Sequence, residues 1–218
     1  MKYRAVWLWV LLAGMAVAGG SDEMVELKIK IPPPDIRIWN GPLDLKSPNL
    51  EPFRGSKPRN PIFVPVGVKL LSRGKKVTSS DPYPVIGDLS FLTDGEKEHD
   101  VATVVELAPR LQWIQVDLGA EYEIYACCVW HKEMAIYRDV ICQVSNDPEF
   151  KDGVVTVFNN DHDNSAKLGK GKDKEYIETS EGRPFAINGV KARYVRFYSN
   201  GNTSNEKNHY TEVDIYGK

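Results

Sequence analysis

Apolar and polar residues alternate along a succession of short runs between residues 62 and 218. The clearest run is Gln112 to Gly119, in which isoleucine, valine and leucine alternate with glutamine and aspartate. This period of two is typical of a strand with one buried face. Trp113 stands near its start, where a large flat side chain can cover the end of a core. We expect a central strand that stops at Gly119, because glycine permits a turn that other residues resist.

Further apolar or β-branched runs follow, at residues 124–131, 140–145, 154–158, 194–198 and 212–216. Clusters of Asn, Asp, Gly and Pro separate them, and these residues accept turn dihedral angles. No segment shows a sustained apolar stripe of helical period. Many short strands with regular turns predict an all-β fold, an antiparallel sandwich or barrel.

The first 18 residues have the pattern of a signal peptide. Lys2 and Arg4 give a positive start, residues 5–17 are apolar, and the small residues at 16–18 suit a cleavage site. The apolar run is short for a membrane span, which needs about 20 residues. The sequence therefore predicts a secreted or periplasmic protein, and the alternative is an uncleaved N-terminal anchor.

Residues 19–61 are rich in proline, beginning with Pro32, Pro33 and Pro34. Proline removes backbone donors and favours extended geometry, so we expect a leader or spacer before a domain at 62–218. Residues 25–31 alternate and could add one strand to a sheet edge.

Charge and cysteine content narrow the function classes. The formal net charge of −2 gives no general attraction to nucleic acid or anionic membranes. Three cysteines, Cys127, Cys128 and Cys142, contain no metal-ligand spacing. Adjacent strand residues point to opposite faces, so either all three are buried thiols or one of the first two pairs with Cys142. No hydrolase, metalloprotease or nucleotide motif is present, which favours a protein without catalytic activity.

Several ordered motifs are similar to those of discoidin domains, the coagulation-factor C-type, galactose-binding-like family. They lie at residues 75–80, 92–95, 113–119, 143–145, 192–198 and 212–217, so the resemblance covers about 66–217. It implies an eight-stranded jelly-roll β-sandwich with ligand loops at one end. Members bind sugars, lipid head groups or proteins, and most have no catalytic activity of their own.

The resemblance also implies a structural calcium site. In similar carbohydrate-binding modules, an aspartate before a glycine and a glutamate near the C-terminus help to hold the ion, and Asp94 and Glu212 match these positions. Asp100 and the Thr103 hydroxyl could contribute from the same loop, since calcium takes oxygen ligands. The spacing of residues 96–100 departs from the usual pattern. The alternative is that Asp94 caps a turn and Glu212 is solvated.

A second acidic run, residues 161–165, resembles the start of an EF-hand loop. Its sixth position is Ala166 and its twelfth is Lys172, where that loop needs glycine and glutamate. We interpret these Asp and Asn side chains as turn-formers that bond their own backbone.

A sugar site is predicted at the loop that joins two of the expected strands. Recognition of a sugar needs an aromatic face and planar polar groups, which Trp130, His131, Glu133, Tyr137 and Arg138 supply. The alternative is that the aromatic residues pack in the core and that Arg138 pairs with Glu133 or a neighbouring aspartate.

Two functional hypotheses follow. The first is a secreted, non-catalytic module that binds a cell-surface or extracellular glycan or glycoconjugate through loops at one end of the sandwich. The second is a structural or adhesion module that contacts proteins of an extracellular or envelope layer, with the proline-rich leader as its tether.

Overall fold

The computed structural model describes residues 23–33, 45–52, 54, 57–98, 103–132 and 134–218. The predicted signal peptide at 1–18 lies outside these residues. No helix in the described part of the chain is long and apolar enough to cross a membrane.

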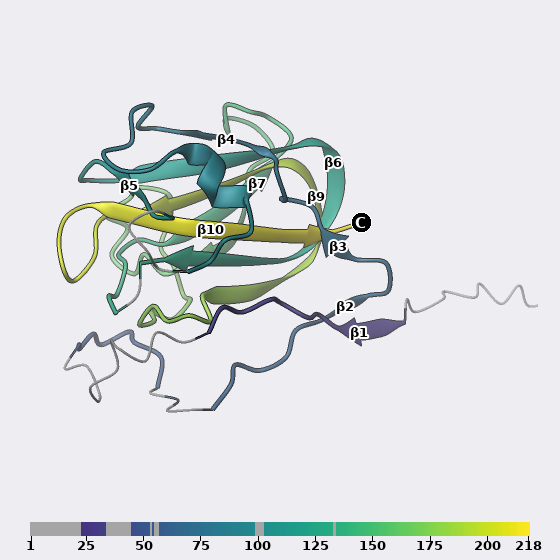
Figure 1. Cartoon of the computed structure of the whole chain (residues 1–218), viewed down its shortest axis with the longest axis horizontal. Helices are drawn as coiled ribbons and strands as arrows, with labels where there is room; N and C mark the ends of the chain where they lie inside the picture. The colour runs from purple at the N-terminus through teal and green to yellow at the C-terminus, as the bar shows by residue number, and fades with distance from the viewer. Residues whose placement is uncertain (1–22, 34–44, 53, 55–56, 99–102, 133) are drawn as a thin grey trace, which may run out of the picture.

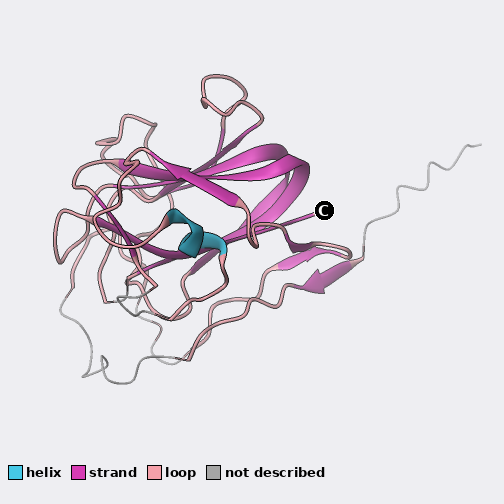
Figure 2. Ribbon diagram, turned by 45° about the horizontal axis from the view of Figure 1, so that its top comes forward, coloured by secondary structure: helices cyan, strands magenta, loops and turns pink. Residues whose placement is uncertain are grey.

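The described residues form an antiparallel β-sandwich with one short 3-10 helix, so the all-β prediction is confirmed (Figures 1 and 2). The strands are β1 (Met24–Glu26), β2 (Phe63–Pro65), β3 (Lys69–Leu70), β4 (Lys76–Ser79), β5 (Val105–Leu107), β6 (Gln112–His131), β7 (Ile141–Ser145), β8 (Val155–Asn159), β9 (Arg183–Ser199) and β10 (Asn208–Gly217), and the helix is η1 (Leu89–Thr93).

Two long strands, β6 and β9, run through both layers of the sandwich. The first part of β6 lies between β4 and the second part of β9, and β7 and β8 continue that layer. The second part of β6 lies between β10 and the first part of β9. Because the same two strands bend from one layer into the other, the layers enclose the main core, which includes Ile114, Val129, Val195, Phe197 and Ile215.

Gly119 does not end the strand, as the alternation pattern led us to expect. It has a φ of 85°, and the pairing of β6 with β9 shifts register between Asp117 and Tyr122. The Asp117 Oδ1 atom accepts a hydrogen bond from the Gly119 N–H at 2.8 Å. Glycine therefore allows a bulge here, and the strand bends and continues into the second layer.

The described part of the predicted spacer packs on the domain. β1 pairs with β2 in a two-stranded sheet, so the strand expected near residues 25–31 forms but does not join the main sheet. Farther along, Leu50 forms a bridge with Glu175. All ten residues of β10 are buried, including Asp214 and Tyr216, which point away from the core. In Figure 1 the leader runs below β10 as an added layer.

All three cysteines are free and buried, which agrees with the first of the two interpretations. Burial and the adjacent Cys127 thiol raise the pKa of Cys142 well above its ordinary value. Burial, followed by the charge of Asp214, does the same to the pKa of Cys128.

Candidate functional site

Four loops meet at one end of the sandwich, on the left in Figure 1. We call residues 80–88, 108–111, 132–140 (without residue 133, which is not described) and 200–207 the apical loops. Hydrogen bonds connect them: Arg138 N donates to Gly201 O at 3.0 Å, and Thr203 N donates to Ile136 O at 3.0 Å. Asn208 Nδ2 donates to the carbonyl of Ala108 at 2.8 Å. The loops therefore form one connected surface at the predicted ligand end.

Trp130, a predicted sugar-stacking residue, is fully buried. Its indole Nε1 donates to the carbonyl of Ser180 at 3.0 Å. A Cβ at Gly182 would lie 2.7 Å from the ring, so glycine is needed for the chain to pass over it. Trp130 lies on the outer face of the second layer, covered by Gly182 and Lys97, and does not face the apical surface, which is a correction to the predicted site.

His131 and Tyr137 are also buried, in an aromatic and histidine stack below the apical loops. Their ring centroids are 4.3 Å apart, and Tyr210 lies 4.8 Å from His131. The Tyr137 hydroxyl lies 3.2 Å from His209 Nδ1, and His209 Nε2 lies 2.9 Å from Glu106 Oε2. Both predicted residues therefore hold the loop in place and are closed to a ligand in this conformation.

The partner of His131 is Glu178, whose Oε2 lies 3.0 Å from His131 Nδ1. Burial lowers the pKa of His131 to about 3 and raises the pKa of Glu178 well above its ordinary value. Burial therefore favours the neutral form of each of the two groups. Their other polar atoms, Nε2 and Oε1, are buried without a partner among the described residues.

Arg138 is the predicted sugar-binding residue that the structure leaves exposed. Its backbone is fixed on loop 200–207, while its guanidinium has no hydrogen bond or ion pair with the described residues. The neighbouring Asp139 does not pair with it, because Asp139 Oδ2 accepts from Ser165 Oγ and Asn200 Nδ2, both at 2.7 Å. Glu133 lies outside the described residues.

Tyr83 is an apical aromatic residue that the sequence reasoning missed. It is 85% exposed, the most exposed large side chain among the hydrophobic residues that the structure describes. Asp81 orders the turn beneath it: Asp81 Oδ1 accepts from Tyr83 N at 3.2 Å, and Oδ2 accepts from Ala108 N at 2.9 Å. The available signal was its position between Pro82 and Pro84 in a turn cluster, where a strand and hence a core position are disfavoured.

The predicted calcium residues are described in part. Asp94 ends η1 and its Oδ1 accepts from Glu96 N at 2.8 Å, which is the capping role given above as the alternative. Thr103 Oγ1 donates to the carbonyl of Glu98. Asp100 lies outside the described residues.

Glu212, the fourth predicted calcium residue, is buried and not solvated. Its Oε1 accepts from Gly95 N at 3.0 Å, and its Oε2 has no partner among the described residues. Burial, with smaller contributions from the charges of Asp214 and Asp94, raises the pKa of Glu212 to about 8, while the Gly95 N–H and Lys97 oppose this rise. An unpartnered buried carboxylate oxygen near a second carboxylate fits a hard cation.

Residues 161–165, whose sequence resembles the start of an EF-hand loop, form a turn, as we expected. Asp161 Oδ1 and Oδ2 accept from the backbone N–H groups of Ser165 and Ala166, at 3.1 and 3.0 Å. Ligand atoms of Asp139, Asp161 and Asp163 lie within 4.8 Å of one another. Because both Asp161 oxygens are already used by the backbone, the turn-forming interpretation accounts for this cluster.

Solved structures of other proteins share this architecture. No protein-family model matches the chain, and no curated protein matches it. Among solved structures, a chitosan-binding module of a chitosanase/glucanase from Paenibacillus sp. IK-5 matches 68% of this chain and 99% of its own, at 20% identity and a TM-score of 0.50. The fold is a galactose-binding-like, discoidin-type β-sandwich.

A second structure with this fold is a family 89 glycoside hydrolase from Clostridium perfringens. It matches 68% of the chain at 22% identity, with a TM-score of 0.52. This galactose-binding-like chain covers 14% of the hydrolase's length. At these identities the likeness establishes the fold alone.

Proposed function

We propose that this protein is a non-catalytic carbohydrate-binding module that holds a glycan across its apical loops. The observation that carries the proposal is Tyr83, an aromatic ring 85% exposed on a turn ordered by Asp81. Exposing a tyrosine ring to water gives no folding benefit, whereas a flat ring on a fixed turn provides a surface for the C–H face of a sugar. The fold shared with the chitosan-binding module is compatible with this role.

Arg138 would supply the polar part of recognition. A guanidinium presents five N–H donors in a planar fork and can bridge neighbouring hydroxyl or acidic groups of a sugar. Its backbone is held to loop 200–207, so the side chain starts from a fixed point. The burial of Trp130, His131 and Tyr137 gives this surface a rigid base.

The spacing of the two loops that carry Tyr83 and Arg138 indicates the size of the ligand. Ile86 bridges to β5, β5 pairs with β10, and β10 pairs with the end of β6. Three strand spacings of about 4.8 Å put loops 80–88 and 132–140 roughly 14 Å apart across this row. A site of that length suits an oligosaccharide better than a single sugar.

The burial of the titratable groups His131 and Glu178 favours a binding role over catalysis. His131 and Glu178, which are 3.0 Å apart and could otherwise serve as acid and base, are both fully buried. General acid–base groups must reach the substrate to transfer a proton. With the signal-like residues 1–18, we propose that the module works outside the cytoplasm.

A glycan array tests this proposal. The full chain should bind a subset of oligosaccharides, and Arg138→Ala should weaken the signal without loss of folding. Silence on the array together with retention on isolated cell envelope would contradict the glycan proposal and favour the structural or adhesion module.

We also propose that calcium stabilises the loop next to η1. Asp94 and Glu212 would hold the ion, with Asp100 and Thr103 as further oxygen donors. The unpartnered Oε2 of Glu212 supports this assignment. A bound cation would supply the opposite charge that Glu212 lacks and would fix the loop to β10.

A further inference from the structure

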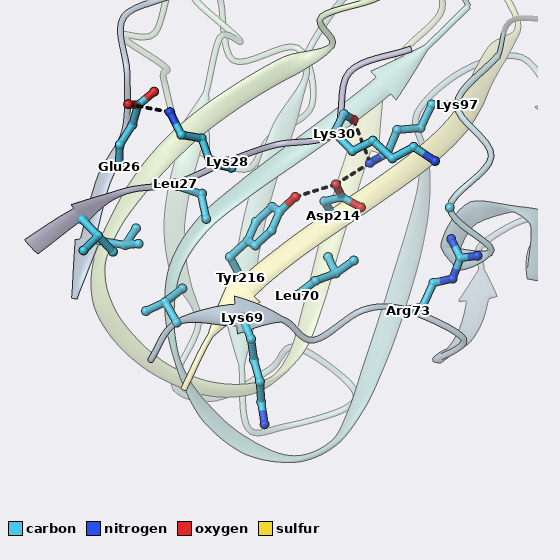
Figure 3. Close-up of a pocket in the computed structure, with 14 residues that line it drawn as sticks. Glu26, Leu27, Lys28, Lys30, Lys69, Leu70, Arg73, Lys97, Asp214 and Tyr216 are labelled. Atoms are coloured by element: carbon cyan, nitrogen blue, oxygen red, sulfur yellow. Dashed lines mark hydrogen bonds and ion pairs between the residues drawn. The ribbon is translucent and has the colours of Figure 1, made fainter. Parts of the chain in front are cut away.

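A pocket of about 480 Å³ lies between the leader and the outer face of the second layer (Figure 3). Residues 25–30 of the leader form one wall, and β3 and β10 form another. The leader is held there by its backbone: Leu27 N donates to Ile62 O at 2.8 Å, and Lys97 Nζ donates to the carbonyl of Lys30 at 3.2 Å. This volume is within the usual range for small-molecule sites.

Basic side chains exceed acidic ones in the lining, although the whole chain is slightly acidic. The five basic residues are Lys28, Lys30, Lys69, Arg73 and Lys97, and the two acidic residues are Glu26 and Asp214. Each acidic residue already has a basic partner: Glu26 lies 2.7 Å from Lys28, and Asp214 lies 2.6 Å from Lys97. The remaining three basic residues have no ion pair with the described residues, so the pocket carries uncompensated positive charge.

Two of these cations are placed to meet a ligand together. Figure 3 shows Lys30 and Arg73 on the same side of the pocket as Lys97, whereas Lys69 points away. The Arg73 guanidinium lies over Gly95, and a Cβ at Gly95 would overlap it. The lack of a side chain at Gly95 therefore leaves space for a planar, anion-binding group at the edge of the pocket.

The rest of the lining is largely apolar. Leu27 from the leader and Leu70 from β3 lie on either side of Tyr216 in Figure 3. Val25 and Val68 add further apolar surface, and Val25 is 42% exposed. A fitting ligand therefore has one anionic group and an apolar face.

We propose that this pocket is a second binding site, for a small carboxylate-bearing molecule whose carboxylate lies between Lys30 and Arg73. An acidic sugar and an alkyl carboxylate share this chemistry. A guanidinium and an ammonium are the groups that bind carboxylates most strongly, and the apolar wall holds the uncharged part of the ligand. The site is separate from the apical loops and does not depend on the proposed function.

Calorimetry on the full chain tests the site with three probes: galacturonate, neutral galactose and octanoate. We expect a carboxylate probe to bind to this pocket and galactose not to bind there. The double variant Lys30→Gln, Arg73→Gln should weaken carboxylate binding at least about tenfold, because both cations are lost. Both side chains are exposed, and the Lys30 carbonyl that Lys97 uses is retained, so folding should not change. Lys191→Gln, at an exposed position of β9, is the matched control.

The possible outcomes distinguish an acidic sugar from an alkyl carboxylate, and this pocket from the apical loops. Binding of galacturonate that the double variant loses assigns an acidic sugar, and the same result with octanoate assigns an alkyl carboxylate. Loss of binding in Tyr83→Ala but not in the double variant would place the ligand at the apical loops and overturn this inference while leaving the proposed function intact. Failure of both carboxylates to bind at millimolar concentration would overturn the site.

Discussion

Arg183 Nη1 donates to Glu51 Oε2 at 2.6 Å, and this contact joins the proline-rich leader to the first residue of β9. Arg59 lies 3.1 Å from the other carboxylate oxygen of Glu51. Burial raises the pKa of Glu51, but the hydrogen bonds and charges of Arg59 and Arg183 outweigh it, so the net pKa is below the ordinary value. The described part of the leader is thus held against the domain.

Substitution Glu51→Ala should lower the free energy of unfolding by about 1–3 kcal/mol, because it leaves two half-buried guanidinium groups without their partner. The loss should shrink as pH falls from about 4.5 through the lowered native pKa, because the unfolded carboxyl group is protonated first and the native one follows. Urea denaturation measures both effects. Glu149→Ala removes an exposed glutamate 4.0 Å from Lys151 and should change stability by less than about 0.5 kcal/mol. Equal effects of the two variants would contradict the role of Glu51.

Glu212 should make the protein less stable as pH rises. Its pKa in the folded protein is about 8, above the ordinary 4.5. The stability that it contributes is therefore fully present below about 4.5 and is lost as pH rises toward 8, with a slope of up to about 1.4 kcal/mol per pH unit. Glu212→Gln should remove this slope in metal-free buffer. Thermal melts from pH 5 to 9 measure it, and parallel curves for both proteins would contradict the assignment.

Calcium should counteract the same slope, because a bound cation favours the charged carboxylate. Adding calcium at pH 8 should raise the melting temperature of the wild type, and a chelator should reverse the change. Glu212→Gln should respond to neither. An unchanged wild-type melting curve would contradict the proposed calcium site.

The three cysteines should be inert in the folded state. Burial hides them, and it raises the pKa values of Cys128 and Cys142, so little thiolate forms. A thiol reagent at pH 8 should find almost no reactive thiol in the native protein and three per chain after denaturation. Rapid reaction without denaturant would contradict their placement.

His131 and Arg138 should respond to mutation in opposite ways. His131→Ala leaves a cavity and removes the partner of Glu178, so it should destabilise the fold by at least about 2 kcal/mol. Arg138→Ala removes an exposed side chain and should change stability by less than about 0.5 kcal/mol. If His131→Ala folds normally and loses only glycan binding, the buried position of His131 is wrong.

The strand pattern could be predicted from the sequence because it depends on local alternation. Most expected runs became strands, and Ile114, Val116 and Leu118 point into the core, whereas Trp113 packs against a second, smaller cluster. The continuation of β6 past Gly119 could not be predicted from the sequence, because a bulge depends on pairing with β9, which is distant in sequence. The role of the leader was missed for the same reason: proline-rich composition describes the local backbone, not the surface that the segment covers.

The candidate sugar site shows the same limit. Trp130, His131 and Tyr137 have suitable chemistry, but β10 and the chain around Gly182 and Glu178 cover them. Polar alternation along β10 predicts an exposed face, whereas Asp214 is buried where Lys97 contacts it and the leader lies nearby. Tyr83 carried a usable signal, since its flanking prolines disfavour a position in a central strand.

Calorimetry with Tyr83→Ala tests the proposed glycan site most directly, using an oligosaccharide selected on the array. Phe63→Ala is the matched control, because Phe63 is 57% exposed on β2, away from the apical loops. We expect the Tyr83 variant to lose about 1–2 kcal/mol of binding free energy, roughly tenfold in affinity, while the Phe63 variant binds as the wild type does. Unchanged binding by Tyr83→Ala would contradict the proposal that this ring holds the glycan.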